Sequence, residues 1–290
     1  MLQFKKILFP TDFSANADRA FLHAAGLADF ESGEVIVQHV VSDYFTKHPH
    51  WAALFDIHEL QKFMDTYVDA HMPAGVCKAN PKVRIRTVIS KGKPAEEISA
   101  LAEREFVDLV VMGSAKGAVT NKVIRLTNRP VLAISAKRPK SEDLSTHKVK
   151  KILIATDFSD HSKKVVEYAF DLKRKFDATI YMLYVIETNR VIEFALRQTR
   201  FIETLDKMRE WATNQLINLT PDEFMHDPRV IRLVESGSPV DTIADVAFEL
   251  GADLTILGTH EYGTIHKHLL GTTTDKLLTK SATPILTVRV

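Results

Sequence analysis

The chain has 290 residues, of which 45% are apolar and 26% are charged, as is usual for a soluble globular protein. Its 38 Lys and Arg residues nearly balance its 37 Asp and Glu residues, so bulk charge does not indicate binding to nucleic acid or to an anionic membrane. The single cysteine, Cys77, excludes an intrachain disulfide. No signal peptide is evident, and no apolar run approaches the roughly 18 residues of a membrane span. We therefore expect a cytoplasmic protein that contacts neither membrane nor nucleic acid.

The first half alternates apolar segments with helical patterns. A short apolar run ends at the turn Thr11-Asp12-Phe13-Ser14, where Ser14 can cap the following helix. A later helix begins after Gly92-Lys93-Pro94, and proline is favourable in a first helical turn. The expected elements are, in order, a strand at 7–9, a helix after Ser14, a strand at 34–41, a long helix, a strand before Gly92, a helix at 95–103, a strand at 109–112, a helix, and a strand at 131–135.

The second half repeats this pattern. The segment KKILFPTDFS at 5–14 recurs as KKILIATDFS at 150–159, an offset of 145 residues. Beyond Gly113 the offset rises to 154, so nine residues present in the second half are missing between Gly113 and Gly117. The expected second-half elements are a strand at 152–154, a helix capped by Ser159, a strand at 179–186, a long helix, a strand before Gly237, a helix at 240–250, a strand at 254–257, a helix, and a strand at 285–290.

A repeat of this length is a domain rather than a solenoid unit. Alternating helices and continuous apolar strands predict an α/β fold with a parallel sheet covered on both faces. We expect two tandem doubly wound, Rossmann-like domains at 1–138 and 150–290, joined by a polar linker at 139–149. One face of the second long helix is apolar, which indicates packing on its own sheet rather than a partner-binding stripe; that face comprises Phe194, Phe201, Leu205, Met208 and Ala212.

The loop that follows Gly258 carries most of the chemistry. Ligands of doubly wound sheets bind beyond the carboxyl ends of the strands, where this loop begins. Gly258 permits a sharp turn, and Gly271-Thr272-Thr273 opens the last helix, whose free N–H groups favour an anion. Two such donor clusters can wrap a polyphosphate. The same residues also fit a plain strand turn followed by a threonine-capped helix.

Taken in order and twice, these motifs resemble the universal stress protein family over nearly the whole chain. The family's nucleotide loop is G-x2-G-x9-G-[ST], and Gly258 and Gly271-Thr272 match its first and third elements. The resemblance implies an adenine nucleotide, ATP or else ADP or AMP, with Mg²⁺ as an option. It places Asp157 at the nucleoside and the Val185 backbone at adenine. The candidate nucleotide-binding residues are Ala155, Thr156, Asp157, Val185, Leu257, Gly258, His260, Glu261, Gly271, Thr272 and Thr273, the last two at the phosphates.

The resemblance also implies a stress-response regulator whose conformation or partner affinity depends on ATP that is not consumed. Paired domains of the family associate through the last strand, so the two halves would form a pseudo-two-fold pair, and whole chains are expected to dimerise through edge strands. The protein partner is left unnamed by the sequence.

Two departures from the family pattern matter. Glu261 stands where the loop has its middle glycine, which restricts the backbone and brings a carboxylate near the phosphates. Lys267 and the histidines His260, His266 and His268 can offset that charge or simply be solvated. The first half lacks the nine-residue spacer, so we expect one nucleotide, in the second domain. The first domain keeps Asp12, Val40 and Gly113 and is expected to be empty or to serve another ligand.

Alternative functions remain open at this point. Glu261 could position a water or a metal for slow ATP hydrolysis, although no catalytic residue is assigned. A nucleotide-free scaffold is the other alternative. We assign no metal site, because the histidines His48, His50, His58 and His71 have no cysteine at metal-binding spacing. Cys77 is expected to be structural.

Overall fold

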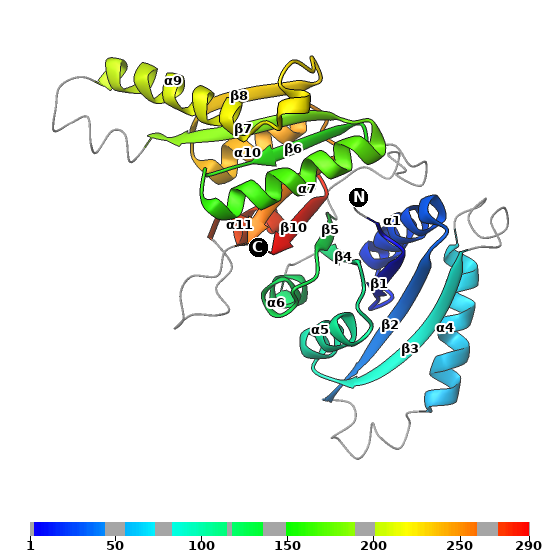
Figure 1. The fold of residues 1–290 in the computed structure, drawn as a ribbon. Coiled ribbons are helices and arrows are strands. Elements are labelled where there is room, and N and C mark those ends of the chain that lie inside the picture. Colours follow the sequence, from blue (N-terminus) through cyan, green and yellow to red (C-terminus); the bar gives the residue numbers. More distant parts are fainter. Residues whose placement is uncertain are drawn as a thin grey trace.

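The computed structural model describes residues 3–43, 56–72, 83–114, 118–135, 149–188, 201–259 and 272–289 (Figure 1). The first half forms β1 (Lys6–Pro10), α1 (Ala15–Glu31), β2 (Glu34–Ser42), α4 (Ile57–His71), β3 (Arg84–Gly92), α5 (Pro94–Arg104), β4 (Leu109–Ser114), α6 (Ala118–Leu126) and β5 (Val131–Ser135). The second forms β6 (Lys151–Ala155), α7 (Asp160–Phe176), β7 (Thr179–Glu187), α9 (Phe201–Leu219), a 3₁₀ turn η2 (Asp222–Phe224), β8 (Val230–Gly237), α10 (Pro239–Glu249), β9 (Leu254–Thr259), α11 (Thr272–Lys280) and β10 (Ile285–Arg289).

These strands build one ten-stranded sheet in the order β3-β2-β1-β4-β5-β10-β9-β6-β7-β8. Within each half every described pairing is parallel. The strand order reverses between β1 and β4, and likewise between β6 and β9, which makes each half doubly wound with its ligand-binding crevice at that switch point. The predicted fold class is thus confirmed.

The two halves meet through their last strands. β5 and β10 pair antiparallel, with Leu132 opposite Leu286. These two leucines are equivalent positions of the repeat, at the offset of 154, so the pseudo-two-fold axis passes between them. The predicted pairing of the domains through the last strand is confirmed. Because β5 and β10 are paired inside the chain, a homodimer formed through sheet edges would have to use β3 or β8.

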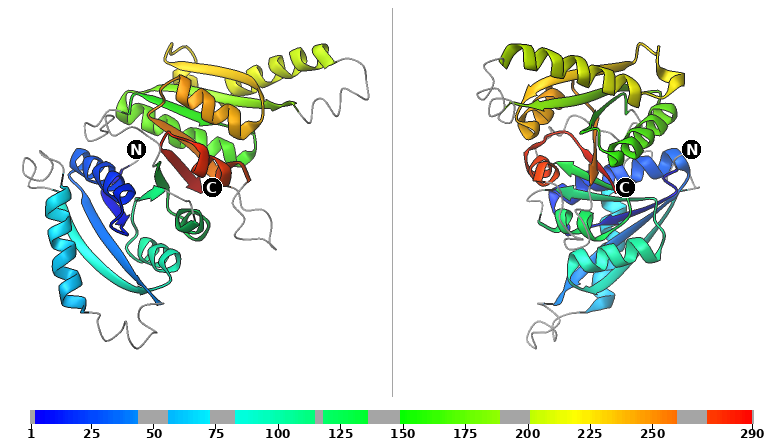
Figure 2. Two further views of the ribbon diagram at one scale, coloured as in Figure 1. Left: turned by 180° about the vertical axis from the view of Figure 1, so that it is seen from behind. Right: turned by 60° about the vertical axis from the view of Figure 1, so that its left-hand side comes forward.

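Helices cover both faces of the sheet (Figure 2). Strand side chains alternate between the faces, so Ile7 and Phe9 join one core cluster while Leu8 joins the other. The first core contains side chains of α1, α4, α7 and α9, and the second contains side chains of α5, α6, α10 and α11. α9 packs on β7 and β8 of its own sheet, and of its predicted apolar face Ala212 is buried while Leu205 and Met208 are half-buried. Phe194 lies outside the described residues.

The helices begin where the sequence predicts. The Ser14 hydroxyl accepts a hydrogen bond from the Ala17 N–H, and the Ser159 hydroxyl accepts one from the Ser162 N–H. α5 and α10 each start at a proline. The predicted linker, 139–149, lies outside the described residues except for Val149, so the domain boundaries remain a prediction.

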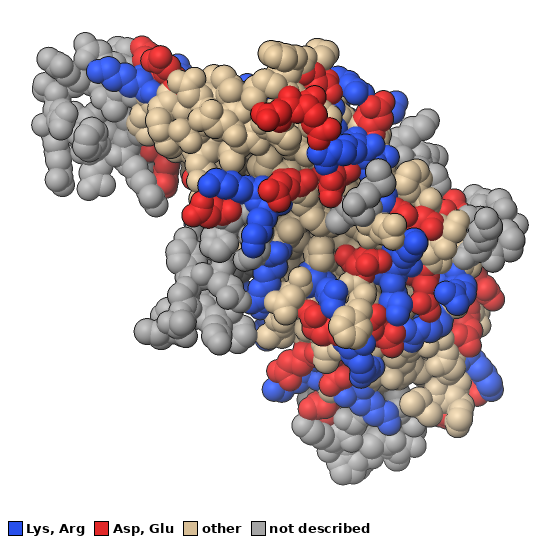
Figure 3. Space-filling model, viewed as in Figure 1, with Lys and Arg blue, Asp and Glu red and all other residues tan. Residues whose placement is uncertain are grey.

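Charged side chains also reinforce the fold. Lys175 of α7 pairs with Glu31 of α1 across the two halves, and its Nζ lies 5.1 Å from the centre of the Phe4 ring. On the face drawn in Figure 3, basic and acidic side chains are interspersed, without a large field of one sign. Among the described helices, none combines the length and hydropathy needed to cross a membrane.

Candidate functional site

The two Thr-Asp-Phe-Ser turns have the same geometry at the carboxyl ends of β1 and β6. Phe13 and Phe158 adopt positive φ angles of 61° and 62°. The turn threonine, Thr11 or Thr156, accepts the N–H of that phenylalanine at 2.9 or 3.1 Å. The residue before the phenylalanine is an exposed aspartate in both turns, so each turn presents a carboxylate at the ligand-binding edge.

The second turn holds its aspartate more firmly. Asp12 and Asp157 both accept the N–H of the serine two residues on, at 3.0 Å. Asp157 Oδ1 additionally accepts the Ser162 hydroxyl at 2.5 Å, whereas Ala17 occupies the equivalent position in the first half. Ser162 therefore orients the Asp157 carboxylate, a role that the sequence analysis did not assign.

The structure brings the described second-half candidates to one edge of the sheet. Ala155 ends β6, Val185 lies near the end of the adjacent β7, and Leu257 and Gly258 lie at the end of β9. The last helix, α11, starts at Thr272, with a half-buried Thr273 in its first turn. The remaining candidates, His260, Glu261 and Gly271, lie outside the described residues, as do Lys267, His266 and His268.

The shortened loop of the first half is visible in the element bounds. Between β4 and α6 there are three residues, 115–117, whereas between β9 and α11 there are twelve, 260–271. The difference of nine matches the gap inferred from the repeat. The helix after the short loop begins with Ala118 and Val119, at the positions of Thr272 and Thr273. The first half therefore lacks both hydroxyls that the resemblance places at phosphates.

The first half nevertheless has a pocket of ≈ 370 Å³ at its switch point, within the range of about 300–1,000 Å³ typical of small-molecule sites. It lies between the ends of β1, β2 and β4 and the helices α5 and α6. Asp12, Val40 and Gly113, the residues proposed to retain a nucleoside cavity, all line it. The first domain therefore has room for a small ligand of its own.

Among the pocket residues that are not predicted from the sequence, Gln38 is a polar residue buried inside a strand. It lies in β2, is completely buried, and lines the pocket. The equivalent residue in β7 is Leu183, because Gln38 pairs with Pro10 in the register in which Leu183 pairs with Ala155. A polar residue inside an otherwise apolar strand was the available signal.

An aromatic cluster packs around Phe13 of the first Thr-Asp-Phe-Ser turn. The Phe13 ring stacks on His39 at 4.6 Å and meets Tyr67 edge-on at 5.1 Å. The Tyr67 hydroxyl donates to Asp18 Oδ1 at 2.6 Å. Burial, and then that hydrogen bond, raise the pKa of Tyr67 far above its ordinary value, so Tyr67 remains a donor and anchors α4 to α1.

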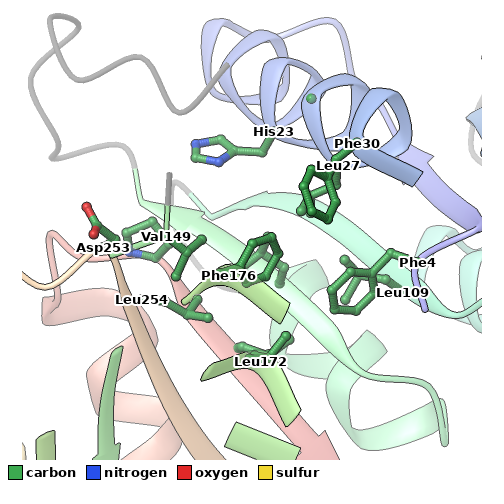
Figure 4. Close-up of a pocket in the computed structure, with 14 residues that line it drawn as sticks. Phe4, His23, Leu27, Phe30, Leu109, Val149, Leu172, Phe176, Asp253 and Leu254 are labelled. Atoms are coloured by element: carbon green, nitrogen blue, oxygen red, sulfur yellow. The ribbon is translucent and has the colours of Figure 1, made fainter. Parts of the chain in front are cut away.

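A second cavity lies where the two halves meet (Figure 4). Its volume is ≈ 60 Å³, and Phe4, Leu27, Leu109, Leu172 and Leu254 are among the mainly apolar side chains around it. This space is too small for a nucleotide and is a packing seam of the interface.

The histidine cluster does not assemble into a metal site within the described part of the chain. His58 and His71 lie at opposite ends of α4, and no group of three metal-ligating side chains occurs among the described residues. His48, His50 and Cys77 fall outside them.

Alanine substitutions at Gly113 and Gly258 should differ in their effect on stability, because the added Cβ meets the backbone in one case and a side chain in the other. A Cβ at Gly113 would lie 2.7 Å from the Asn16 backbone, whereas one at Gly258 would meet only the Val165 side chain, at 3.0 Å. We expect Gly113→Ala to lower the free energy of unfolding by about 1–3 kcal/mol, and Gly258→Ala by clearly less, because its closest contact is longer and involves one side-chain methyl rather than the backbone. Urea denaturation of both variants measures this, and equal losses would contradict it.

Comparison with known proteins agrees with this geometry. The sequence profile described as the universal stress protein family matches residues 3–135 and again 148–289. The chain belongs to the universal stress protein family.

A universal stress protein of Methanocaldococcus jannaschii is 30% identical over 158 residues, covering 47% of this chain and 98% of that relative. The crystal structure of a universal stress protein from Archaeoglobus fulgidus DSM 4304 matches 99% of both chains with a TM-score of 0.66 and 20% identity, which shows a shared fold. A universal stress protein described in complex with cAMP is a further structural neighbour, at 22% identity over 49% of this chain with a TM-score of 0.33.

Proposed function

We propose that this universal stress protein binds one adenine nucleotide, ATP or its di- or monophosphate, in the second domain and acts as a nucleotide-dependent regulator in the stress response. The observation that carries the proposal is the difference between the halves. Only the second keeps twelve residues between β9 and α11, together with threonines at the start of α11. Such a helix start favours phosphate.

The remaining candidates fit the same ligand. The Asp157 carboxylate, which is oriented by Ser162, can accept hydrogen bonds from ribose hydroxyls. Half-buried Val185 offers backbone groups at the strand end to the base. A bound Mg²⁺ would neutralise the phosphates beside Glu261. The nucleotide then changes partner affinity, and by linkage the partner changes nucleotide affinity by the same factor.

The test is a stoichiometry measurement followed by a swap between the halves. Nucleotide released from denatured protein is quantified by mass spectrometry, and ATP-Mg²⁺ uptake is measured by calorimetry. We expect about one nucleotide per chain. The double variant Thr272→Ala, Thr273→Val copies Ala118 and Val119. It should weaken ATP binding at least about 100-fold, since it removes two hydrogen bonds to a charged group, each contributing about 1.5–3 kcal/mol.

Val119→Thr in the first half is the matched control and should leave the stoichiometry unchanged. Two nucleotides per chain would contradict the assignment to the second domain, and none would favour the scaffold function. Steady ATP turnover that Glu261→Gln abolishes, while binding survives, would favour the hydrolase instead.

A further inference from the structure

The pocket of the first domain has a buried polar group with unused bonding capacity. Gln38 is completely buried, although its neighbours on β2, Ile36 and Val37, are apolar core residues. Its amide nitrogen donates to Ser90 Oγ at 2.9 Å and to the Glu97 carbonyl at 3.4 Å. A carbonyl can only accept, so the contact with Glu97 fixes which way the amide points.

The amide oxygen of Gln38 is thereby left without a partner. Oε1 is buried and accepts no hydrogen bond from any residue in the described part of the chain. Buried acceptors are normally paired, because desolvation without a hydrogen bond is unfavourable. Since Gln38 lines the pocket, a donor supplied by a ligand can satisfy this oxygen.

The other residues that line the pocket favour a ligand with an apolar ring and without a phosphate group. Ile98, Met112 and Val119 provide apolar surface suited to the faces of a ring. At the helix that would meet phosphates, the first domain has Ala118 after a three-residue loop. The exposed carboxylate of Asp12 also lines the pocket and can accept a hydrogen bond from a hydroxyl group of the ligand.

We propose that the first domain binds an uncharged, phosphate-free nitrogen heterocycle, of nucleobase or nucleoside size, that donates an N–H to Gln38 Oε1. The second domain cannot recognise this donor in the same way, because Leu183 stands at the equivalent position. The two halves of the repeat therefore differ in ligand as well as in loop length. This assignment does not depend on what the second domain binds.

The experiment is calorimetric titration of the full chain, kept in saturating ATP-Mg²⁺, with adenosine and with cytidine. We expect one site for at least one of the two. Gln38→Leu, which copies Leu183 and suits a buried strand, should weaken that binding about tenfold, the size of one hydrogen bond in a buried site. Val119→Trp, at a residue that is 40% exposed, should fill the pocket and abolish binding.

Both variants should retain the unfolding midpoint of the unsubstituted protein to within a few degrees and the same ATP stoichiometry, which shows that the fold is intact. N6,N6-dimethyladenosine is the control ligand for adenosine, because it lacks the amino N–H. It should bind to the unsubstituted protein as weakly as adenosine binds to Gln38→Leu. Binding of neither nucleoside would overturn the proposal, as would binding that both variants leave unchanged. Failure of ATP to bind would instead bear on the second domain alone.

Discussion

Replacing Asp227 by asparagine is expected to lower the free energy of unfolding by about 3–5 kcal/mol, the usual effect of removing one partner of a buried ion pair. The Lys173 side chain is only 2% exposed, and its Nζ lies 3.0 Å from Asp227 Oδ2. Asparagine preserves the volume and the hydrogen bond that Oδ1 accepts from the Arg229 N–H. It removes the charge and replaces Oδ2, the oxygen that faces Lys173, by an amide nitrogen that cannot accept a hydrogen bond. The buried ammonium of Lys173 then keeps the Ala178 carbonyl as an acceptor but has no counter-charge at Asp227.

The same pair predicts a dependence on pH. The Arg229 N–H, and then Lys173, lower the pKa of Asp227 below its ordinary value. A carboxyl whose folded pKa is depressed stabilises the fold above its unfolded pKa and ceases to do so as the pH falls through the folded pKa. Stability of the unsubstituted protein should therefore fall in acid, below about pH 4, more steeply than that of Asp227→Asn.

Urea denaturation of both proteins at a series of pH values measures the two effects. Lys62→Ala is the control, because Lys62 pairs with Glu59 on α4 with both side chains more than two-thirds exposed, and should cost less than about 1 kcal/mol. A loss below about 1 kcal/mol for Asp227→Asn would show that the Lys173 ammonium does not depend on the Asp227 charge.

Truncating either leucine on the pseudo-two-fold axis should destabilise the whole chain. Leu132 and Leu286 face each other in the β5–β10 pair and are 7% and 2% exposed. We expect Leu132→Ala and Leu286→Ala each to lower the free energy of unfolding by about 2–5 kcal/mol. The two losses should be similar, because the repeat gives the residues equivalent surroundings on either side of the axis.

The double variant tests whether the leucines act together. Residues in contact show non-additive effects, so we expect the loss in the double variant to differ from the sum of the two single losses by about 0.5–3 kcal/mol. Leu126→Ala, at an exposed position of α6, is the matched control and should change stability little. Additive losses, or a loss confined to one variant, would contradict a shared interface. Calorimetry and urea denaturation supply both measurements.

Most helices and strands can be predicted from the sequence, because each element of the fold occurs in both halves of the repeat. The strand at 131–135 was predicted with the bounds of β5, and the Ser14 and Ser159 caps form as expected. Pairing between β5 and β10 was accessible only through the family resemblance, since an edge strand does not name its partner.

The site was less accessible, for physical reasons. The family resemblance predicts Asp157 as a ligand contact. It does not predict Ser162, because that hydrogen bond depends on how the turn enters α7. Gln38 was passed over as part of a buried strand, since its significance lies in a pairing register and in an amide oxygen without a donor. Roles for Glu261 and Gly271 remain predictions.

The antiparallel junction of β5 and β10 has a consequence for signalling. Strands are parallel within each half, so reversing direction at the junction turns the carboxyl edges of the two halves to opposite ends of the sheet. A partner docked over one edge meets one ligand and leaves the other accessible. With both proposed ligands bound, the chain would respond to two ligands that do not compete for space. Any cooperation between them would have to pass through the contacts between the halves, among them the β5–β10 pair and the Lys175–Glu31 ion pair.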